Sequence, residues 1–216
     1  MQEQDLAVLI LAAGKGTRME NSLAKVLIPI AGKPTLEFVL QKEQLGTGHA
    51  ARQAEHTLMN FEGRILVLCG DMPLIKFKTL GSLLRRHKEV GAKCSVLTLK
   101  SKVNKDFGRI IRDANGSFLR IVEYRDASPQ EKNVDELNSG VYCFDKSLFF
   151  KALCSIGDSN IQKEYYLTDA LEYSVNIGCP VAFLETEDTD EIIGINTLND
   201  LKRVEQLLKN RCLPPK

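Results

Sequence analysis

An apolar run of strand length, Leu6 to Leu11, leads directly into a glycine-rich segment that carries several basic residues. Leu11 to Met19 reads LAAGKGTRM, and Lys25 follows six residues later. Glycine and small alanine side chains let backbone N–H groups approach a phosphate chain, because no large side chain stands in the way. Lys15, Arg18 and Lys25 add cationic donors around the same loop. The segment predicts a phosphate-binding loop at the end of a first β-strand.

The spacing excludes two common phosphate-binding loops. A Walker loop needs G-K-[ST] after a four-residue spacer, and the dinucleotide fingerprint needs a third glycine that this segment lacks. A generic glycine turn at a strand end is the plainer alternative. The order of strand, AAGKGTRM and then KVL favours a specific nucleotide-binding loop.

Composition is that of an ordinary globular protein. The chain has 216 residues, of which 44% are hydrophobic and 26% charged, a length that suits one α/β domain or two closely joined lobes. The net charge of +1 gives no indication of a nucleic-acid partner. No apolar stretch approaches the roughly 20 residues that span a bilayer. The N-terminal MQEQDLAV runs into a strand rather than a signal peptide, so we expect a cytoplasmic protein with no membrane partner.

Cysteine and histidine usage argues against a structural metal site. None of the six cysteines forms a CxxC pair, most lie in apolar runs, and the three histidines are scattered. Buried free thiols in a reducing compartment are therefore expected, rather than disulfides or zinc ligands. The cysteines are Cys69, Cys94, Cys143, Cys154, Cys179 and Cys212.

Strand and helix patterns alternate in the first half of the chain, which predicts a parallel sheet covered on both faces. The expected strands are 6–11, 64–69 and 93–99, and the expected helices are 35–40, 48–59 and 78–90. After about Lys100 the pattern changes to strands joined by polar turns, which indicates a smaller mixed sheet. The expected elements there are strands 107–113, 118–123, 140–144 and 180–184, and helices 167–177 and 198–209.

Asp71 follows the apolar strand RILVLCG, at the edge of the sheet where α/β proteins bind ligands. Mg²⁺ held with a triphosphate needs one or two hard oxygen ligands from protein, and Asp71 suits that need. A turn aspartate before Met72-Pro73 is the alternative, about as probable on this residue alone. Asn196 suits a neutral metal ligand, a helix cap, or both.

Two further segments carry candidate ligand groups. QLGTGHA, Gln44 to Ala50, is a second glycine-rich loop that runs into a helix, although Thr47 also suits a helix N-cap. Glu123, Asn138 and the EYYLTD run from Glu164 to Asp169 offer donors and acceptors of the kind that bind sugar hydroxyls. Taken singly, each of these is more often a surface or capping residue than a ligand.

Together these segments resemble a known family. The chain is similar to the N-terminal uridylyltransferase domain of the bifunctional bacterial N-acetylglucosamine-1-phosphate uridylyltransferase/glucosamine-1-phosphate acetyltransferase. The matching stretches run in order from residue 6 to about 201: LAAGKGTRM, KVL, GKP, QKEQLGTGHA, GDMPLI, FGRIIRD, IVEYRDAS, ELNSGVY, EYYLTD and GINT. LAAGKGTRM alone indicates only a sugar nucleotidyltransferase, whereas QLGTGHA, FGRI and EYYLTD make the resemblance specific.

The resemblance implies an α/β fold with a Rossmann-like, mostly parallel sheet of the glycosyltransferase-A kind and a smaller sugar-binding lobe. It divides the single nucleotidyltransferase domain into a nucleotide half, 1–99, a sugar-phosphate half, 100–197, and a closing helix and tail, 198–216. It also implies site residues. Nucleotide binding falls to Leu11, Ala12, Ala13, Gly14, Lys25, Gln41, Gly46 and Thr47; catalysis to Arg18 and Lys25; Mg²⁺ to Asp71 and Asn196; and the sugar phosphate to Gly108, Glu123, Asn138, Tyr166 and Thr168.

The chain departs from the family at three places. Ala24 replaces the usual proline before Lys25, and the sequence ends at Lys216, before the β-helix domain that carries acetyl transfer. We therefore expect no acetyltransferase activity, and a monomer or weak oligomer. The third departure follows Leu40, where roughly 35 residues of the family, about one strand-helix crossover, have no counterpart. Either the stretch is absent from this sequence only, as the intact flanking motifs favour, or the protein is a deletion form that folds poorly or binds uracil weakly.

The expected reaction is Mg²⁺-dependent uridylyl transfer from UTP to N-acetylglucosamine-1-phosphate, which gives UDP-N-acetylglucosamine and pyrophosphate. Two alternatives stay open at this point: another sugar-1-phosphate nucleotidyltransferase, for example one that uses glucose-1-phosphate with UTP or dTTP, and a non-catalytic relative disabled by the shortened segment. A dinucleotide oxidoreductase is a distant third, because the glycine pattern is wrong for it.

Overall fold

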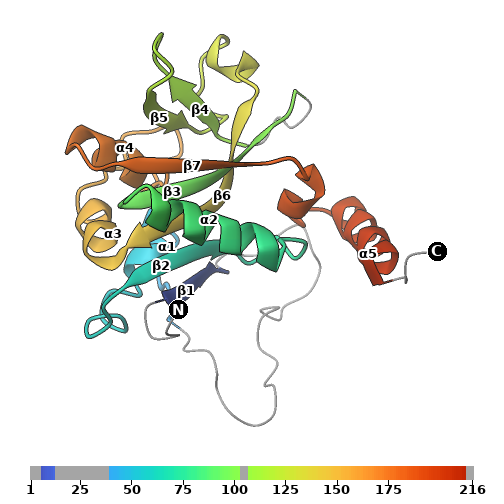
Figure 1. The fold of residues 1–216 in the computed structure, drawn as a ribbon, viewed down its shortest axis with the longest axis horizontal. Coiled ribbons are helices and arrows are strands. Elements are labelled where there is room, and N and C mark those ends of the chain that lie inside the picture. The colour runs from blue at the N-terminus through green and yellow to red at the C-terminus, as the bar shows by residue number, and fades with distance from the viewer. Residues whose placement is uncertain (1–5, 13–38, 103–106, 213–216) are drawn as a thin grey trace.

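The computed structural model of the chain describes residues 6–12, 39–102 and 107–212 (Figure 1). Helices and strands alternate along these residues. In chain order they are β1 (Leu6–Leu11), α1 (Thr47–Arg52), β2 (Arg64–Cys69), α2 (Phe77–Glu89), β3 (Cys94–Lys100), β4 (Arg109–Arg112), β5 (Phe118–Val122), η2 (Glu131–Asn133), β6 (Glu136–Asp145), α3 (Lys146–Leu153), α4 (Asp169–Asn176), β7 (Val181–Thr186), η3 (Thr189–Ile192) and α5 (Leu198–Cys212).

Within the described residues, a mixed sheet of seven strands organises the fold, in the order β1-β2-β6-β3-β7, with the β4–β5 hairpin attached to β6. β1 pairs with β2 and β3 pairs with β7 in parallel, whereas β6 is antiparallel to both of its neighbours. Leu11 is the register partner of Cys69, and the Gly70 N–H donates to the Leu11 carbonyl at 2.9 Å. The carboxyl ends of β1 and β2 therefore lie side by side, at the edge predicted for ligand binding.

The structure confirms the α/β class and the predicted strands, with shifts of a few residues at their ends. Helix α3, Lys146–Leu153, was not predicted, because Asp145 is both the last residue of β6 and the N-cap of the helix, so no turn separates the two elements. Helix α1 is shorter than the expected helix over 48–59, because the chain beyond Arg52 continues with i→i−3 hydrogen bonds. Of the helix expected over 35–40, only Val39 and Leu40 lie within the described residues, and they form no regular element.

Two apolar clusters cover the two faces of the sheet. One packs α3 and α4 against Ile65, Val96 and Phe144, and the other packs α2 against Leu97 and Val141. In Figure 1 helix α2 crosses in front of the sheet and α3 lies toward its other side. Each buried Leu or Phe contributes roughly 1.5–3 kcal/mol relative to exposure, and successive side chains of β2 and β3 supply the two clusters in turn.

The expectation of buried thiols holds for Cys94 and Cys143, whereas Cys69 and Cys179 are partly buried and Cys154 is exposed. Cys69, Cys94, Cys143, Cys154 and Cys179 are free. Burial raises the pKa of Cys69, Cys94 and Cys143 to about 12, so these thiols stay protonated. Across the same part of the chain, no helix combines the length and the apolar character that a membrane crossing requires.

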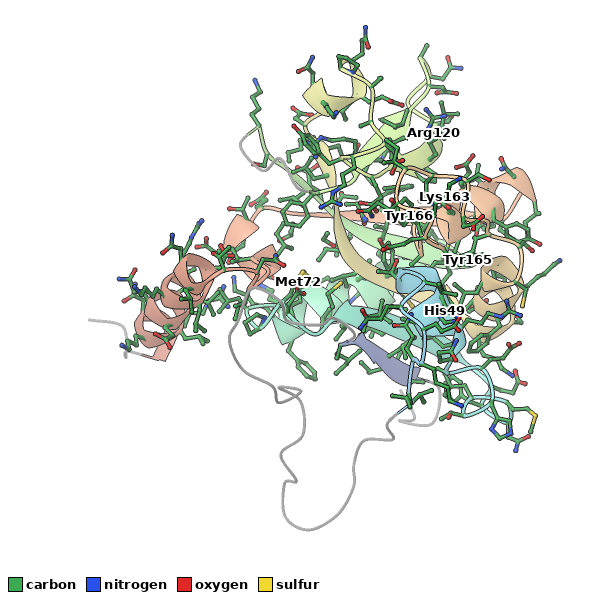
Figure 2. All side chains as sticks on the ribbon, turned by 180° about the vertical axis from the view of Figure 1, so that it is seen from behind. His49, Met72, Arg120, Lys163, Tyr165 and Tyr166 are labelled. Atoms are coloured by element: carbon green, nitrogen blue, oxygen red, sulfur yellow. The ribbon has the colours of Figure 1, made fainter. Side chains whose placement is uncertain are left out.

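Two segments about 120 residues apart in the sequence are joined by three hydrogen bonds, which we call the interlock. The Gly48 N–H donates to the Tyr165 carbonyl at 2.8 Å, and the Tyr165 N–H donates to the Leu45 carbonyl at 2.8 Å. The Leu167 N–H donates to Thr47 Oγ1 at 3.0 Å. Figure 2 shows Tyr165 and Tyr166 beside His49 of α1. The interlock therefore ties the start of α1 to the segment that leads into α4.

The glycines of the GTG sequence make this close approach possible. Gly46 has φ of +109°, and a Cβ at this position would lie 2.6 Å from the Tyr165 carbonyl oxygen and 2.8 Å from its nitrogen. A Cβ on Gly48 would lie 3.0 Å from the same carbonyl oxygen and closer still to Ile156. Both glycines therefore serve backbone-to-backbone packing.

We predict that Gly46→Ala lowers the free energy of unfolding by more than 2 kcal/mol. The left-handed φ alone costs a non-glycine residue roughly 1–2 kcal/mol, and the clash with the Tyr165 backbone adds to that cost. Gly116→Ala is the matched control, because Gly116 has φ of +82° and no heavy atom within 4 Å of its Cβ position. Urea unfolding should show a larger loss of unfolding free energy for Gly46→Ala than for Gly116→Ala. Equal losses would show that the interlock does not stabilise the fold.

A buried histidine lies on the face of the sheet that α2 covers. His87 is 2% exposed; its Nδ1 lies 2.7 Å from Ser95 Oγ and its Nε2 lies 3.3 Å from Asp145 Oδ1. Burial lowers the pKa of His87 below its usual 6.5, and the neighbouring Asp145 carboxylate opposes this shift. The folded state therefore holds the imidazole neutral at pH values where the unfolded chain binds a proton.

We predict that His87 makes the protein less stable as the pH falls below about 6.5, because its imidazole then binds a proton in the unfolded state and not in the folded state. His87→Gln should flatten the fall in the free energy of unfolding between pH 7.5 and pH 5.5. His56→Gln, at an exposed turn position, should leave the pH dependence of the wild type unchanged. Urea unfolding at several pH values tests this; identical slopes for wild type and His87→Gln would contradict it.

Candidate active site

A cleft of about 750 Å³ opens where β2 ends and is lined from several elements. Its walls come from the turn after β2, from the segments just before β4 and after β5, from the middle of β6, and from the chain between η3 and α5. Asp71, Gly108, Glu123, Asn138 and Asn196 all line it. Five residues that the sequence predicts for metal and sugar-phosphate binding are therefore brought together.

Asp71 and Asn196 converge on Gly194. A Cβ on Gly194 would lie 3.3 Å from Asp71 Oδ2 and 3.3 Å from Asn196 Nδ2. The Ile195 N–H donates to the Asp71 carbonyl at 2.9 Å, which fixes the loop 194–196 against the end of β2. Glycine at 194 thus keeps open the space that the two side chains share.

This donor set fits Mg²⁺ in a phosphate complex. A carboxylate and a side-chain amide oxygen are hard ligands, and Mg²⁺ in nucleotide sites takes one or two protein groups and fills its shell with water and phosphate. The described residues contain no group of three or more His, Cys, Asp or Glu side chains placed to hold a metal on their own. Burial raises the pKa of Asp71.

Glu123 presents a partly buried carboxylate to the cleft. Thr168 Oγ1 donates to Glu123 Oε1 at 3.4 Å, and burial raises the pKa of Glu123 while the Thr168 hydrogen bond lowers it. A Cβ on Gly108 would lie 3.5 Å from Glu123 Oε1 and 2.9 Å from Ile121. Gly108 therefore leaves the carboxylate accessible, and Thr168, which does not line the cleft, holds it from behind.

Asn138 lies beside Glu123 and has both ends of its amide fixed. Its Oδ1 accepts the Gly140 N–H at 3.1 Å, and its Nδ2 donates to Tyr142 Oη at 2.7 Å. Tyr142 is buried in the core beneath the cleft. Because a backbone N–H only donates, the oxygen of the amide is identified by its partner, and one N–H and one lone pair stay available for a ligand.

Tyr166 supports the rim of the cleft and does not line it. Its hydroxyl donates to Asp126 Oδ2 at 3.1 Å and accepts from Gln162 Nε2 at 2.9 Å. Arg125 Nη1 in turn donates to Gln162 Oε1 at 2.5 Å. Burial raises the pKa of Tyr166 to about 12. Arg125 and Gln162 line the cleft, so this chain of hydrogen bonds joins Tyr166 to the rim.

The residues predicted to bind nucleotide lie only partly within the described residues. Leu11 ends this strand, and Ala12 is exposed directly after it. Gln41 Nε2 donates to the Gly46 carbonyl at 3.2 Å and lies 3.0 Å from His49 Nδ1. Thr47 Oγ1 is engaged by the interlock. These residues do not line the cleft, and Ala13, Gly14, Arg18 and Lys25 lie outside the described residues.

Several residues of this site were not predicted. Tyr142 lies within an apolar strand and looks in the sequence like any other core aromatic residue. Arg125 and Gln162 carry no motif of their own. Asp200 does carry a signal, because it lies three residues after Thr197; its carboxylate accepts from the Thr197 N–H at 2.7 Å and from the Asn196 N–H at 3.1 Å. This cap orients the loop that carries Asn196.

Comparisons with solved structures agree with the fold. A UDP-glucose pyrophosphorylase complexed with UDP-glucose superposes with a TM-score of 0.62 at 15% identity, over 79% of this chain and 64% of that one. A Bacillus anthracis protein assigned as a glucose-1-phosphate thymidylyltransferase superposes with a TM-score of 0.69 at 16% identity, over 98% of this chain and 97% of that one. At these identities the likeness concerns the fold alone.

Curated relatives are much more similar in sequence. The Bifunctional protein GlmU of Bacillus cereus is 41% identical over 237 residues, and the GlmU of Bacillus thuringiensis gives the same figures. The match covers 94% of this chain and 52% of each relative. The chain therefore spans about half the length of these relatives.

The same match carries a length difference. Ninety-four per cent of 216 residues is about 203, whereas the match extends over 237, so about 34 of its positions have no residue in this chain. This agrees in size with the roughly 35 residues that, by the resemblance, have no counterpart after Leu40.

The family profile described as Nucleotidyl transferase matches residues 32–190, which is most of the chain. The match includes the end of β2, the walls of the cleft around Glu123 and Asn138, and the segment of the interlock after Tyr165. Because the match covers more than half of the chain, the chain belongs to the nucleotidyl transferase family.

Proposed function

We propose that this protein transfers uridylyl groups from UTP to N-acetylglucosamine-1-phosphate, with Mg²⁺, and releases UDP-N-acetylglucosamine and pyrophosphate. The observation that carries the proposal is the cleft in which the Asp71 and Asn196 pair faces Glu123 and Asn138. The identity of 41% to GlmU proteins supports the choice of uridine and of N-acetylglucosamine.

The two sides of the cleft suit the two kinds of chemistry in this reaction. Asp71 and Asn196 provide oxygen ligands for a cation that neutralises phosphates. Glu123 accepts hydrogen bonds and Asn138 both donates and accepts, which matches sugar hydroxyls that do both. In this proposal Gly108, Tyr166 and Thr168 complete the sugar-phosphate site, with Thr168 acting through Glu123.

On the nucleotide side, the proposal assigns uridine to Leu11, Ala12, Ala13, Gly14, Gln41, Gly46 and Thr47, and the phosphates to Arg18 and Lys25. Leu11 and Ala12 suit this role because they end β1 next to the turn that carries Asp71. Thr47 contributes through the interlock, which holds the Gly46 backbone beside Gln41.

The chemistry asks little of the protein beyond positioning and charge neutralisation. An oxygen of the sugar phosphate attacks the α-phosphorus of UTP in line, and pyrophosphate leaves. The attacking phosphate is already ionised at neutral pH, so no strong general base is needed. When bound, Mg²⁺ supplies charge neutralisation between the phosphates of the two substrates. Glu123 and Asn138 orient the sugar, and Arg18 and Lys25 stabilise the charge that grows on the phosphates.

The proposal further treats residues 1–99 and 100–197 as the nucleotide and sugar-phosphate halves of one domain that is closed by 198–216. It treats the protein as a cytoplasmic enzyme that is a monomer or a weak oligomer. A second candidate rests on the length difference of about 34 positions from the GlmU proteins. In this candidate the chain is a non-catalytic relative that binds nucleotide weakly and releases no pyrophosphate.

Pyrophosphate release separates the two candidates. A sample of checked intact mass should release pyrophosphate from UTP plus N-acetylglucosamine-1-phosphate with Mg²⁺, and EDTA should abolish the release. Asp71→Ala should lower turnover about a hundredfold or more with an unchanged circular dichroism spectrum, because it removes the carboxylate from the proposed metal site. Asp158→Ala, at an exposed position, is the control and should behave as wild type. If the folded wild type releases no pyrophosphate with UTP or dTTP and either sugar phosphate, the result favours the non-catalytic relative. If Asp71→Ala is active, Asp71 is not a ligand of the metal.

We predict that Glu123→Gln raises the KM for the sugar phosphate about tenfold or more while the KM for UTP stays within twofold. The reason is that a hydrogen bond to a charged acceptor is worth roughly 1.5–3 kcal/mol, and the carboxylate faces only the sugar side of the cleft. Glu185→Gln is a suitable control, because Glu185 pairs with Lys100 on an exposed strand end. Steady-state kinetics with each substrate varied in turn tests this; equal rises in both KM values would contradict a sugar role.

A further inference from the structure

Strand β6 carries an irregularity beside the cleft. Val96 of β3 is the register partner of Tyr142, and Thr98 is the partner of Asn138, so two residues of β3 span what four residues of β6 span. Gly140 lies at the centre of this bulge with φ of +81°. β-Bulges bend a strand and re-aim side chains, and they are enriched next to active sites.

Two side chains of the bulged segment are in contact, although their residues lie four apart in the same strand. In a regular strand, residues four apart are separated by roughly 13 Å. Here Asn138 Nδ2 donates to Tyr142 Oη at 2.7 Å, and the Gly140 N–H donates to Asn138 Oδ1 at 3.1 Å. Both fixed ends of the Asn138 amide therefore depend on the bulge.

Burial divides the two side chains between core and cleft. Tyr142 is 3% exposed and packs its ring in the core cluster with Phe144, whereas Asn138 is 6% exposed and lines the cleft. A phenylalanine would fill the same core space as Tyr142. The hydroxyl is thus the part of Tyr142 that the core does not require and that Asn138 contacts.

We propose that Tyr142 is a positioning residue for sugar-phosphate binding, acting through Asn138. Its hydroxyl takes one hydrogen of the Asn138 amide and, together with the Gly140 N–H, fixes the amide so that one N–H and one oxygen lone pair face the cleft. Such a pair matches a hydroxyl that donates and accepts at once. The inference rests on the proposed function, because it takes Asn138 as a ligand of the sugar phosphate.

The first test is Tyr142→Phe, which keeps the ring and removes the hydroxyl. We expect the KM for N-acetylglucosamine-1-phosphate to rise about fivefold to tenfold, the size of one lost hydrogen bond, with the KM for UTP unchanged. Tyr173→Phe is the matched control, because Tyr173 packs against the same core cluster from α4. A rise in neither KM, or an equal rise in both, overturns the proposal.

A double-mutant cycle tests whether the effect passes through Asn138. In an Asn138→Ala background, Tyr142→Phe should cause no further rise in the KM for the sugar phosphate, because the group that it positions is gone. Equal rises in the two backgrounds overturn the assignment, since Tyr142 would then act independently of Asn138.

An activity-free measurement keeps this inference distinguishable from the proposed function. The side-chain NH₂ signals of Asn138 in a ¹⁵N correlation spectrum, assigned by their loss in Asn138→Asp, should move in Tyr142→Phe and stay in place in Tyr173→Phe. If the wild type is active and the signals do not move, Tyr142 positions nothing and the proposed function stands. If the wild type releases no pyrophosphate, the proposed function fails, and the movement of the signals decides the positioning of Asn138 alone.

Discussion

The interlock between the start of α1 and the segment before α4 is the contact on which the site depends. Three hydrogen bonds of 2.8, 2.8 and 3.0 Å hold Leu45, Thr47 and Gly48 against Tyr165 and Leu167. One partner carries the residues proposed for uridine, and the other leads into Thr168, which supports Glu123. In the proposed function, this backbone contact joins the segment assigned to uridine to the segment that supports the sugar-phosphate site.

The cleft itself follows from the ends of strands and from one defect in a strand. Parallel pairing of β1 with β2 puts Leu11 next to Cys69, so the turn with Asp71 meets the end of β1. Gly194 then lets Asn196 approach Asp71. The bulge in β6 turns Asn138 toward the cleft and gives it Tyr142 as a buried support. Asn138 in particular is held by Tyr142 in the core and by the Gly140 N–H of the backbone, which is how a site stays preorganised.

Much of the fold was predictable because buried strands are apolar runs bounded by turns, and the location of Asp71 after such a run predicted the edge of the sheet where the cleft lies. The antiparallel direction of β6 and the helix α3 were not predictable, since neither leaves a signal in the local pattern. The GTG sequence shows a different limit. Its glycines suggested contact with a ligand, but a Cβ on Gly46 or Gly48 would meet the Tyr165 backbone, a contact about 120 residues away in the sequence. Tyr142 was missed for the same reason, because only the bulge brings it to Asn138.

The central claim is that these 216 residues form one complete two-substrate site, although about 34 positions of the GlmU match are absent. Calorimetric titration with UDP-N-acetylglucosamine and Mg²⁺ tests this directly, because the product occupies both halves of the site at once. We predict one binding event per chain. Its Kd should be lower than the Kd of UMP or of N-acetylglucosamine-1-phosphate titrated separately. A folded protein that binds N-acetylglucosamine-1-phosphate but not UDP-N-acetylglucosamine would contradict it, since the nucleotide half would then be incomplete.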